Sequence, residues 1–169
     1  MPDRMKCIIS NSAIIEQHVG IYNDGGIIEI GDGCHLKQGC VLRSYGGRIT
    51  LTNRVSIGEY TIIYGHGGVS VGEATIIAPH CTISAQKHIY PANIPLRYSG
   101  ETKSGIFIDS GSIISSHVVV VDSVFIGKNV MVGANSLVNI NIPDSSFAAG
   151  SPIKIISSDI SNKLYGRLD

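Results

Sequence analysis

Three side chains, His66, His88 and Asp122, combine proton chemistry with a spacing that could bring them together. A neutral imidazole accepts a proton near pH 7, and a histidine beside polar partners can act as a general base, which is worth about 10²–10⁴-fold in rate. His66 interrupts the glycine-rich stretch YGHGGVSVG, and His88 follows it in SAQKH. Whether these groups meet depends on the elements that position them.

An aliphatic side chain returns every six residues through most of the chain, in six sets of three. Helices repeat at 3.6 residues and simple strands at 2, so a period of six fits short strands separated by corners. Three hexads make one triangular coil, and coils stacked about 4.8 Å apart form one continuous core. The sets are Ile9, Ile15, Ile21; Ile30, Leu36, Leu42; Leu51, Ile57, Ile63; Val71, Ile77, Ile83; Ile108, Ile114, Val120; and Ile126, Val132, Val138.

Every insertion between these sets falls at the third corner of the coil. The gaps there are 9, 9, 8, 25 and 6 residues, whereas positions within a set are always six apart. The pairs Gly25–Gly26, Gly46–Gly47 and Gly67–Gly68 lie in the smaller insertions, where we expect outward bulges that need positive φ. The largest insertion predicts an extended loop at 84–107. Insertions in repeat proteins gather on the binding face, so the two histidines and the aspartate are expected to converge at this corner.

Three segments of the chain resemble hexapeptide-repeat acetyltransferases of the galactoside and maltose acetyltransferase type. GVSVGEATIIAPHCTISAQKH (68–88) is similar to the stretch that leads to the active histidine of that family. GIFIDSGSIISSHVVVVDSVFIGKNVMVGANSLV (105–138) is similar to its later repeats, and NIPDSSFAAGSPIKII (141–156) to its C-terminal ending. The resemblance covers 50–156, and the loop most resembles bacterial sugar O-acetyltransferases of surface-polysaccharide pathways.

The resemblance implies an all-β fold, a left-handed parallel β-helix of about six coils. This acyltransferase domain would span 1–156, with the loop inserted and a short C-terminal tail at 157–169. It also implies direct transfer of an acetyl group from acetyl-CoA to a sugar hydroxyl, with His88 as the general base and without a metal. His66 and Asp122 would orient that histidine or help to hold the acceptor.

The resemblance also implies where the co-substrate and the subunits lie. Family members are homotrimers with each site between two subunits, and CoA lies beside the later coils. By motif position, Ser115, Gly133, Ala134 and Ser136 would lie near the pantetheine arm. Lys154 would lie near the nucleotide phosphates, where a cation has a direct electrostatic role.

The sequence departs from the family pattern at five positions. Ile113 stands where a Trp is usual, Ser115 and Ser123 stand where Gly is usual, Asp109 replaces the Gly of an IGD motif, and Ile153 replaces the Ala of a PAK motif. These departures concern the acceptor pocket and the pantetheine contacts, and they leave the position of His88 unchanged.

Metal and disulfide chemistry have weaker support in the sequence. The cysteines lack a CxxC spacing and occupy inward positions, where free Cys acts as a small buried hydrophobe. His80 and His117 would stack in neighbouring coils, but zinc needs three or four ligands. The sequence leaves open an aminosugar N-acetyltransferase, a non-catalytic β-helix scaffold and a zinc carbonic-anhydrase-like protein. The four cysteines are Cys7, Cys34, Cys40 and Cys81.

Composition excludes several other classes. The 13 basic and 13 acidic side chains cancel, so the basic field expected of a nucleic-acid binder is missing. The chain has no apolar run of the roughly 18–20 residues that cross a membrane, and its N-terminus lacks the apolar segment of a signal peptide. We therefore expect a cytoplasmic protein without a membrane span.

Overall fold

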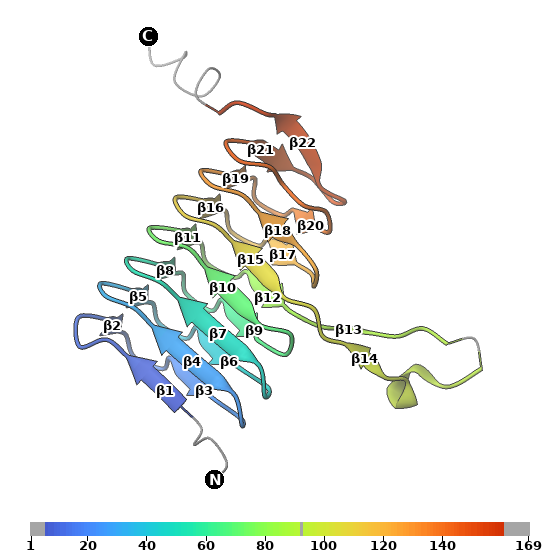
Figure 1. The fold of residues 1–169 in the computed structure, drawn as a ribbon. Helices are drawn as coiled ribbons and strands as arrows, with labels where there is room; N and C mark the ends of the chain where they lie inside the picture. The colour runs from blue at the N-terminus through green and yellow to red at the C-terminus, as the bar shows by residue number, and fades with distance from the viewer. Residues whose placement is uncertain (1–5, 92, 161–169) are drawn as a thin grey trace.

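The computed structural model describes residues 6–91 and 93–160, which form a parallel β-solenoid consistent with a left-handed β-helix (Figure 1). Three sheets run along its axis. The first contains β1 (Lys6–Ile9), β4 (Ile27–Ile30), β7 (Arg48–Leu51), β10 (Val69–Val71), β15 (Ile106–Ile108) and β18 (Phe125–Ile126). The second contains β2 (Ile14–Ile15), β5 (His35–Leu36), β8 (Ser56–Ile57), β11 (Ile76–Ile77), β16 (Ile113–Ile114), β19 (Met131–Val132), β21 (Phe147–Ala149) and β22 (Lys154–Ser157). The third contains β3 (Gly20–Tyr22), β6 (Val41–Arg43), β9 (Ile62–Tyr64), β12 (Thr82–Ser84), β17 (Val119–Val120) and β20 (Leu137–Val138).

The predicted six-residue positions lie in register from coil to coil. In the first sheet, for example, Leu51 pairs with Val71 and Val71 with Ile108. From the second coil onward these side chains are buried and form one core along the axis. A partial seventh turn continues it with the buried side chains of Ile142, Ala148 and Ile153. The predicted architecture is therefore confirmed.

The first coil departs from the expected burial. Ile9 and Ile15 are each 39% exposed, because β1 and β2 form the end of the stack and have a neighbouring coil on one side only. Cys7 is exposed for the same reason, so the prediction that all four cysteines are buried is wrong at this position. The other three thiols are buried, and burial raises the pKa of Cys40 to about 12.

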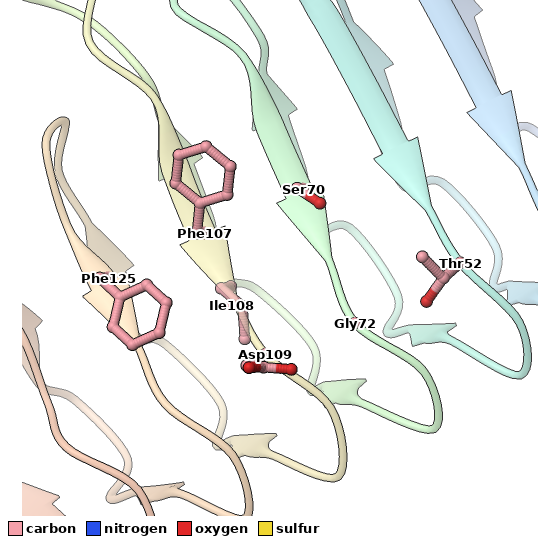
Figure 2. A pocket seen from close by; sticks show the side chains of 7 residues that line it. All are labelled: Thr52, Ser70, Gly72, Phe107, Ile108, Asp109 and Phe125. Atoms are coloured by element: carbon pink, nitrogen blue, oxygen red, sulfur yellow. The ribbon is translucent and has the colours of Figure 1, made fainter.

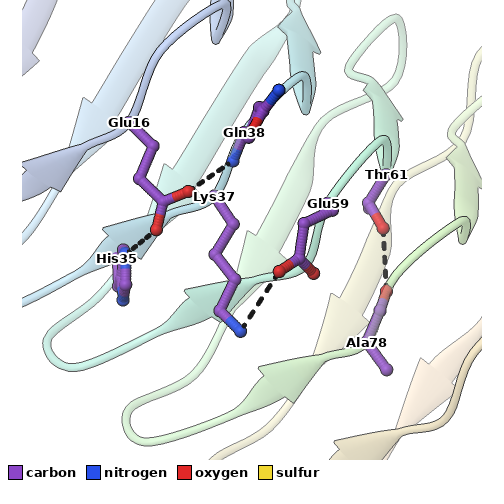
Figure 3. Close-up of polar contacts among 7 residues, drawn as sticks. All are labelled: Glu16, His35, Lys37, Gln38, Glu59, Thr61 and Ala78. Carbon is purple, nitrogen blue, oxygen red and sulfur yellow. Dashed lines mark hydrogen bonds and ion pairs between the residues drawn. The ribbon is translucent and has the colours of Figure 1, made fainter.

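Polar contacts between neighbouring coils reinforce the backbone ladder (Figure 3). The carboxylate of Glu16 accepts hydrogen bonds from the backbone N–H of Gln38 and contacts the ring of His35 at 2.6 Å. Lys37 lies 3.7 Å from Glu59 in the next coil. Ion pairs near the surface of a protein are weakened by solvent, so these contacts add little to the stability that the core provides.

The glycine pairs have two separate functions in the third corner, which joins the third sheet to the first. Gly46 has a φ of +81°, the left-handed conformation that was predicted for the bulges. The φ of its neighbour Gly47 is not positive. A Cβ atom at Gly47 would overlap the carbonyl oxygen of Gly65 in the next coil. The second glycine of this pair is therefore needed for close approach between coils.

The large insertion is an antiparallel hairpin that projects from the third corner (Figure 1). It contains β13 (Lys87–His88), the short 3₁₀ helix η1 (Leu96–Tyr98) and β14 (Glu101–Thr102). The predicted loop at 84–107 is slightly too long, because Ser84 belongs to β12 and Ile106 and Phe107 to β15. At the C-terminus, β22 ends at Ser157, and most of the predicted tail lies outside the described residues.

Substitution of Gly47 should separate its packing role from the conformational role of Gly46. We expect Gly47→Ala to lower the free energy of unfolding by about 3 kcal/mol, because the added methyl forces two coils apart. Gly46→Asn is the matched control and should cost less than about 1 kcal/mol, since Asn tolerates positive φ and the site is open. Urea unfolding of both variants measures the difference, and equal losses would contradict this account.

Candidate active site

His88 faces a carboxylate across the hairpin. It is the β-bridge partner of Glu101, and its Nδ1 lies 3.9 Å from the Oε1 atom of that residue, within ion-pair range but longer than a hydrogen bond. The imidazole is half exposed. A carboxylate beside Nδ1 favours a proton on that nitrogen, which leaves Nε2 free to accept a proton from a substrate. The arrangement suits a general base.

Glu101 was not among the residues predicted from the sequence. Its partnership with His88 depends on the register of a hairpin whose two short strands are separated by twelve residues. A connection of that length carries no turn motif that fixes a register, in contrast to a two-residue turn. A search for carboxylates within the insertion would have found it, but not its pairing with His88.

His66 lies one coil before the hairpin, at the same corner. Its ring stacks on Tyr45 with centroids 4.2 Å apart and an interplanar angle of 16°. Burial lowers the pKa of His66 from its ordinary value of 6.5; Glu101 opposes this shift and Lys103 adds to it. His66 is therefore neutral at pH 7, and Glu101 is the charged group that acts on both predicted histidines.

Two buried polar atoms at the root of the hairpin have no hydrogen-bond partner within the described part of the chain. They are Nδ1 of His66 and Oε1 of Gln86, which occupy equivalent places in successive turns of the third corner. Buried polar groups are normally paired, so an unpaired atom in a native structure needs an explanation such as a bound water or ligand. The root of the hairpin thus offers polar groups close to His88.

Asp122 lies at the third corner of the next coil, as predicted, but it contacts the hairpin strands and not the His88 ring. Its side chain is only 1% exposed. The hydroxyl of Thr102 donates to Oδ2 at 3.2 Å, and Nζ of Lys87 lies 3.7 Å from Oδ1. Lys87 and Thr102 form the bridge next to the His88–Glu101 pair. Asp122 therefore connects both strands of the hairpin to the solenoid through these two contacts.

The residues expected to bind CoA follow a different edge, the second corner, which joins the second sheet to the third. Ser115 follows β16, Gly133 follows β19, and Lys154 pairs with Ala149, which is the next residue along this edge. Ala134 is exposed beside them. The structure thus brings four of the five predicted residues into one line along the later coils.

Ser136, the fifth, is turned inward. It is buried, its hydroxyl donates to the carbonyl oxygen of Gly133 at 2.6 Å, and it accepts the N–H of Gly150 at 3.0 Å. Its hydroxyl therefore stabilises the backbone of this corner. A pantetheine arm on this edge would contact Gly133 and Ala134 and not the Ser136 hydroxyl.

One chain does not place these two sets of residues together. His88 and Glu101 lie at the third corner, whereas the line from Ser115 to Lys154 lies at the second, and the third sheet separates the two edges.

The predicted stack of His80 and His117 is present on the second corner. Their rings are 5.1 Å apart and nearly parallel, at 4°, and Tyr60 extends the stack. Within residues 6–91 and 93–160, no group of three or more His, Cys, Asp or Glu side chains is arranged to hold a metal ion. No helix in the same ranges is long and apolar enough to span a membrane.

No protein-family profile matches the chain, and no curated protein sequence does. Among solved structures, AntD, an N-acyltransferase from Bacillus cereus in complex with dTDP and 3-hydroxybutyryl-CoA, matches with a TM-score of 0.79 and 25% identity, over 90% of this chain and 82% of that one. A serine-to-alanine variant of AntD in complex with dTDP-4-amino-4,6-dideoxyglucose and Coenzyme A matches with 0.78 and 25%, over 90% and 83%. A maltose O-acetyltransferase from Clostridium difficile matches with 0.63 and 20%, over 92% and 71%.

These neighbours are acyltransferases, and the β-solenoid is consistent with a hexapeptide-repeat left-handed β-helix acetyltransferase. The chain thus shares its fold with acyltransferases, two of which were crystallised with CoA or an acyl-CoA.

The contacts of Asp122 predict a local effect on the hairpin. We expect Asp122→Ala to speed amide hydrogen exchange in 86–88 and 101–102 about tenfold, because Thr102 and Lys87 lose their buried partner. Asp122→Asn keeps one acceptor for Thr102 and should have a smaller effect. Hydrogen exchange read by mass spectrometry gives the comparison. An increase of equal size in the core strands would show a global loss of stability and contradict a local tie.

Proposed function

We propose that the chain is an acetyl-CoA-dependent acetyltransferase that acts on a hydroxyl of a sugar or sugar-containing acceptor, with His88 as the general base. The observation that carries this proposal is the pairing of His88 with Glu101 on the hairpin of a solenoid whose structural neighbours are acyltransferases. Maltose O-acetyltransferase is one of these neighbours, which supports a sugar acceptor.

His88 and Glu101 have different roles in proton transfer. Nε2 of His88 takes the proton from the acceptor hydroxyl as its oxygen attacks the thioester carbonyl. The carboxylate of Glu101 stabilises the imidazolium that forms, in the way that a carboxylate supports a catalytic histidine. The imidazolium then returns the proton to the sulfur as the carbon–sulfur bond breaks, which releases CoA. The acetyl group moves directly, so the chain needs no covalent intermediate.

Asp122 and His66 act indirectly in this proposal. Asp122 is a positioning residue, because it fixes the hairpin that carries His88 and Glu101. Nδ1 of His66 and Oε1 of Gln86 are buried at the root of the hairpin, so these two residues support the hairpin from below and do not touch the acceptor through those atoms.

An aminosugar N-acyltransferase is the second candidate. The match to AntD, an N-acyltransferase crystallised with an amino-sugar nucleotide, favours it. The same base would take a proton from the attacking nitrogen, so the two activities differ in the acceptor and not in the hairpin. Acceptors that carry either a hydroxyl or an amine at one ring position distinguish them. Synthesis of a surface polysaccharide in the cytoplasm would suit either activity.

His88 should be required for turnover but not for binding of the donor. We expect wild-type protein to bind acetyl-CoA at micromolar strength by calorimetry, and Lys154→Ala to weaken this binding by removing a cation from the phosphates. His88→Ala should lower kcat by about 10²–10⁴-fold across a panel of sugar acceptors and leave acetyl-CoA binding intact. His18→Asn, at an exposed histidine on the first coil, is the control. A wild-type protein that does not bind acetyl-CoA would refute the proposal and favour a non-catalytic scaffold.

We further propose that the active unit is a homotrimer with each site between two chains, since His88 and the CoA edge lie on different corners. Co-expression of His88→Ala chains with Ala134→Glu chains tests this, because each type lacks one half of the site. In randomly mixed trimers about a quarter of the interfaces combine an intact His88 with an intact CoA edge, so about a quarter of wild-type activity should return. Sedimentation should give the mass of three chains. A site within one chain would recover no activity on mixing.

A further inference from the structure

A groove crosses the outer face of the first sheet, away from both edges of the proposed active site. Its volume is about 300 Å³, and it spans four successive coils (Figure 2). Phe107 and Phe125 form one part, and Thr52, Ser70 and Asp109 supply polar groups beside them. Thr52, Gly72 and Asp109 follow the C-terminal ends of their strands, whereas the hairpin joins β15 at its N-terminal end.

The polar part of the groove results from a small residue between two larger ones. Thr52, Gly72 and Asp109 occupy equivalent places at the ends of β7, β10 and β15. A Cβ atom at Gly72 would lie 2.5 Å from the backbone nitrogen of Ser110, so no side chain fits there. The Thr52 and Asp109 side chains therefore flank a gap that is one strand wide.

Asp109 is one of the departures from the family pattern, and the proposed acetyl transfer does not use it. Its Oδ1 accepts the backbone N–H of Ser110 at 2.7 Å and the Ser110 hydroxyl at 3.2 Å. These bonds fix the carboxylate of Asp109, which lines the groove. The Thr52 hydroxyl donates to the carbonyl oxygen of Val71 at 3.1 Å, which leaves its oxygen able to accept.

The aromatic part of the groove has no evident folding role. Phe107 and Phe125 are 56% and 45% exposed, and they are two of only three phenylalanines in the chain. They are register neighbours in β15 and β18, and Figure 2 shows their rings on neighbouring strands of the groove. Their spacing of one strand, about 4.8 Å, is close to the length that one pyranose adds to a glycan chain.

We propose that this groove binds a pyranose-containing glycan at a subsite separate from the catalytic hairpin. The apolar C–H face of a pyranose stacks on an aromatic ring, and its hydroxyls donate to a carboxylate and exchange hydrogen bonds with Ser and Thr. Open rings beside Asp109, Thr52 and Ser70 match both halves of that chemistry. The inference rests on the proposed function only in taking the acceptor to be a sugar.

Other occupants fit the lining less well. A lipid surface would cover the Asp109 carboxylate with apolar atoms, and moving a charged group out of water is costly. A nucleotide would bring its phosphates against the same negative charge, which disfavours it. A neutral, hydroxyl-rich ligand meets neither penalty.

Saturation-transfer NMR with maltotriose and triacetylchitotriose tests the subsite. We expect transfer to the sugar C–H protons of at least one probe, and a dissociation constant about tenfold higher for Phe107→Ser and for Asp109→Ala. Ile8→Ser is the matched control, because Ile8 points outward from the same sheet at 41% exposure but lies outside the groove. It should leave glycan binding unchanged, and calorimetry with acetyl-CoA should give the same affinity for all variants.

Three outcomes would overturn the subsite. Wild-type protein that binds acetyl-CoA but neither glycan would remove the subsite and leave acetyl transfer standing. Glycan binding that is lost in His88→Ala but unchanged in Phe107→Ser would place the sugar at the hairpin alone. A smaller assembly for Phe107→Ser in light scattering, with unchanged glycan binding, would make the groove an interface between copies.

Discussion

The structure depends on the parallel backbone pairing of one coil with the next. A single coil has no interior of its own, and its aliphatic side chains are buried only when a second coil lies above and a third below. The first coil shows this directly, because Ile9 and Ile15 remain partly exposed while the equivalent residues of the second coil are buried. Register between coils therefore controls both the core and the place of every outward side chain.

Because of this register, residues at equivalent positions of successive coils line up along one edge or one face of the solenoid. Ser115, Gly133 and Ala149 are far apart in the chain but follow one corner, because each lies at an equivalent place in its turn, and Lys154 joins this edge as the antiparallel partner of Ala149. The same rule gathers His66, Gln86 and Asp122 along the third corner, and Phe107 and Phe125 on the first sheet. Side chains on this scaffold are arranged by turns of the solenoid, and within one chain the second corner and the hairpin at the third corner lie on opposite sides of the third sheet.

Most of the solenoid could be predicted because the residues that determine it recur at a fixed period in the sequence. The six-residue positions, the third-corner insertions and the stack of His80 on His117 all follow from counting residues. The hairpin could not be predicted in this way, because within it the period stops. Its antiparallel register, the His88–Glu101 pair and the contacts of Asp122 with Lys87 and Thr102 depend on side-chain packing that no repeat encodes. For Ser136, the repeat predicts the position in the coil but not the direction of the side chain. Its hydroxyl donates to the carbonyl oxygen of Gly133 and therefore points inward.

The hairpin leaves the solenoid after β12 and returns in β15 without disturbing the stack, since Val69 pairs with Ile106 and Val71 with Ile108 as if the insertion were absent. The packing of the core therefore does not depend on the length of the insertion. The entropy of closing a loop grows only with the logarithm of its length, so doubling it costs about 0.6 kcal/mol. The hairpin can consequently be lengthened, shortened or replaced with little effect on the stability of the solenoid.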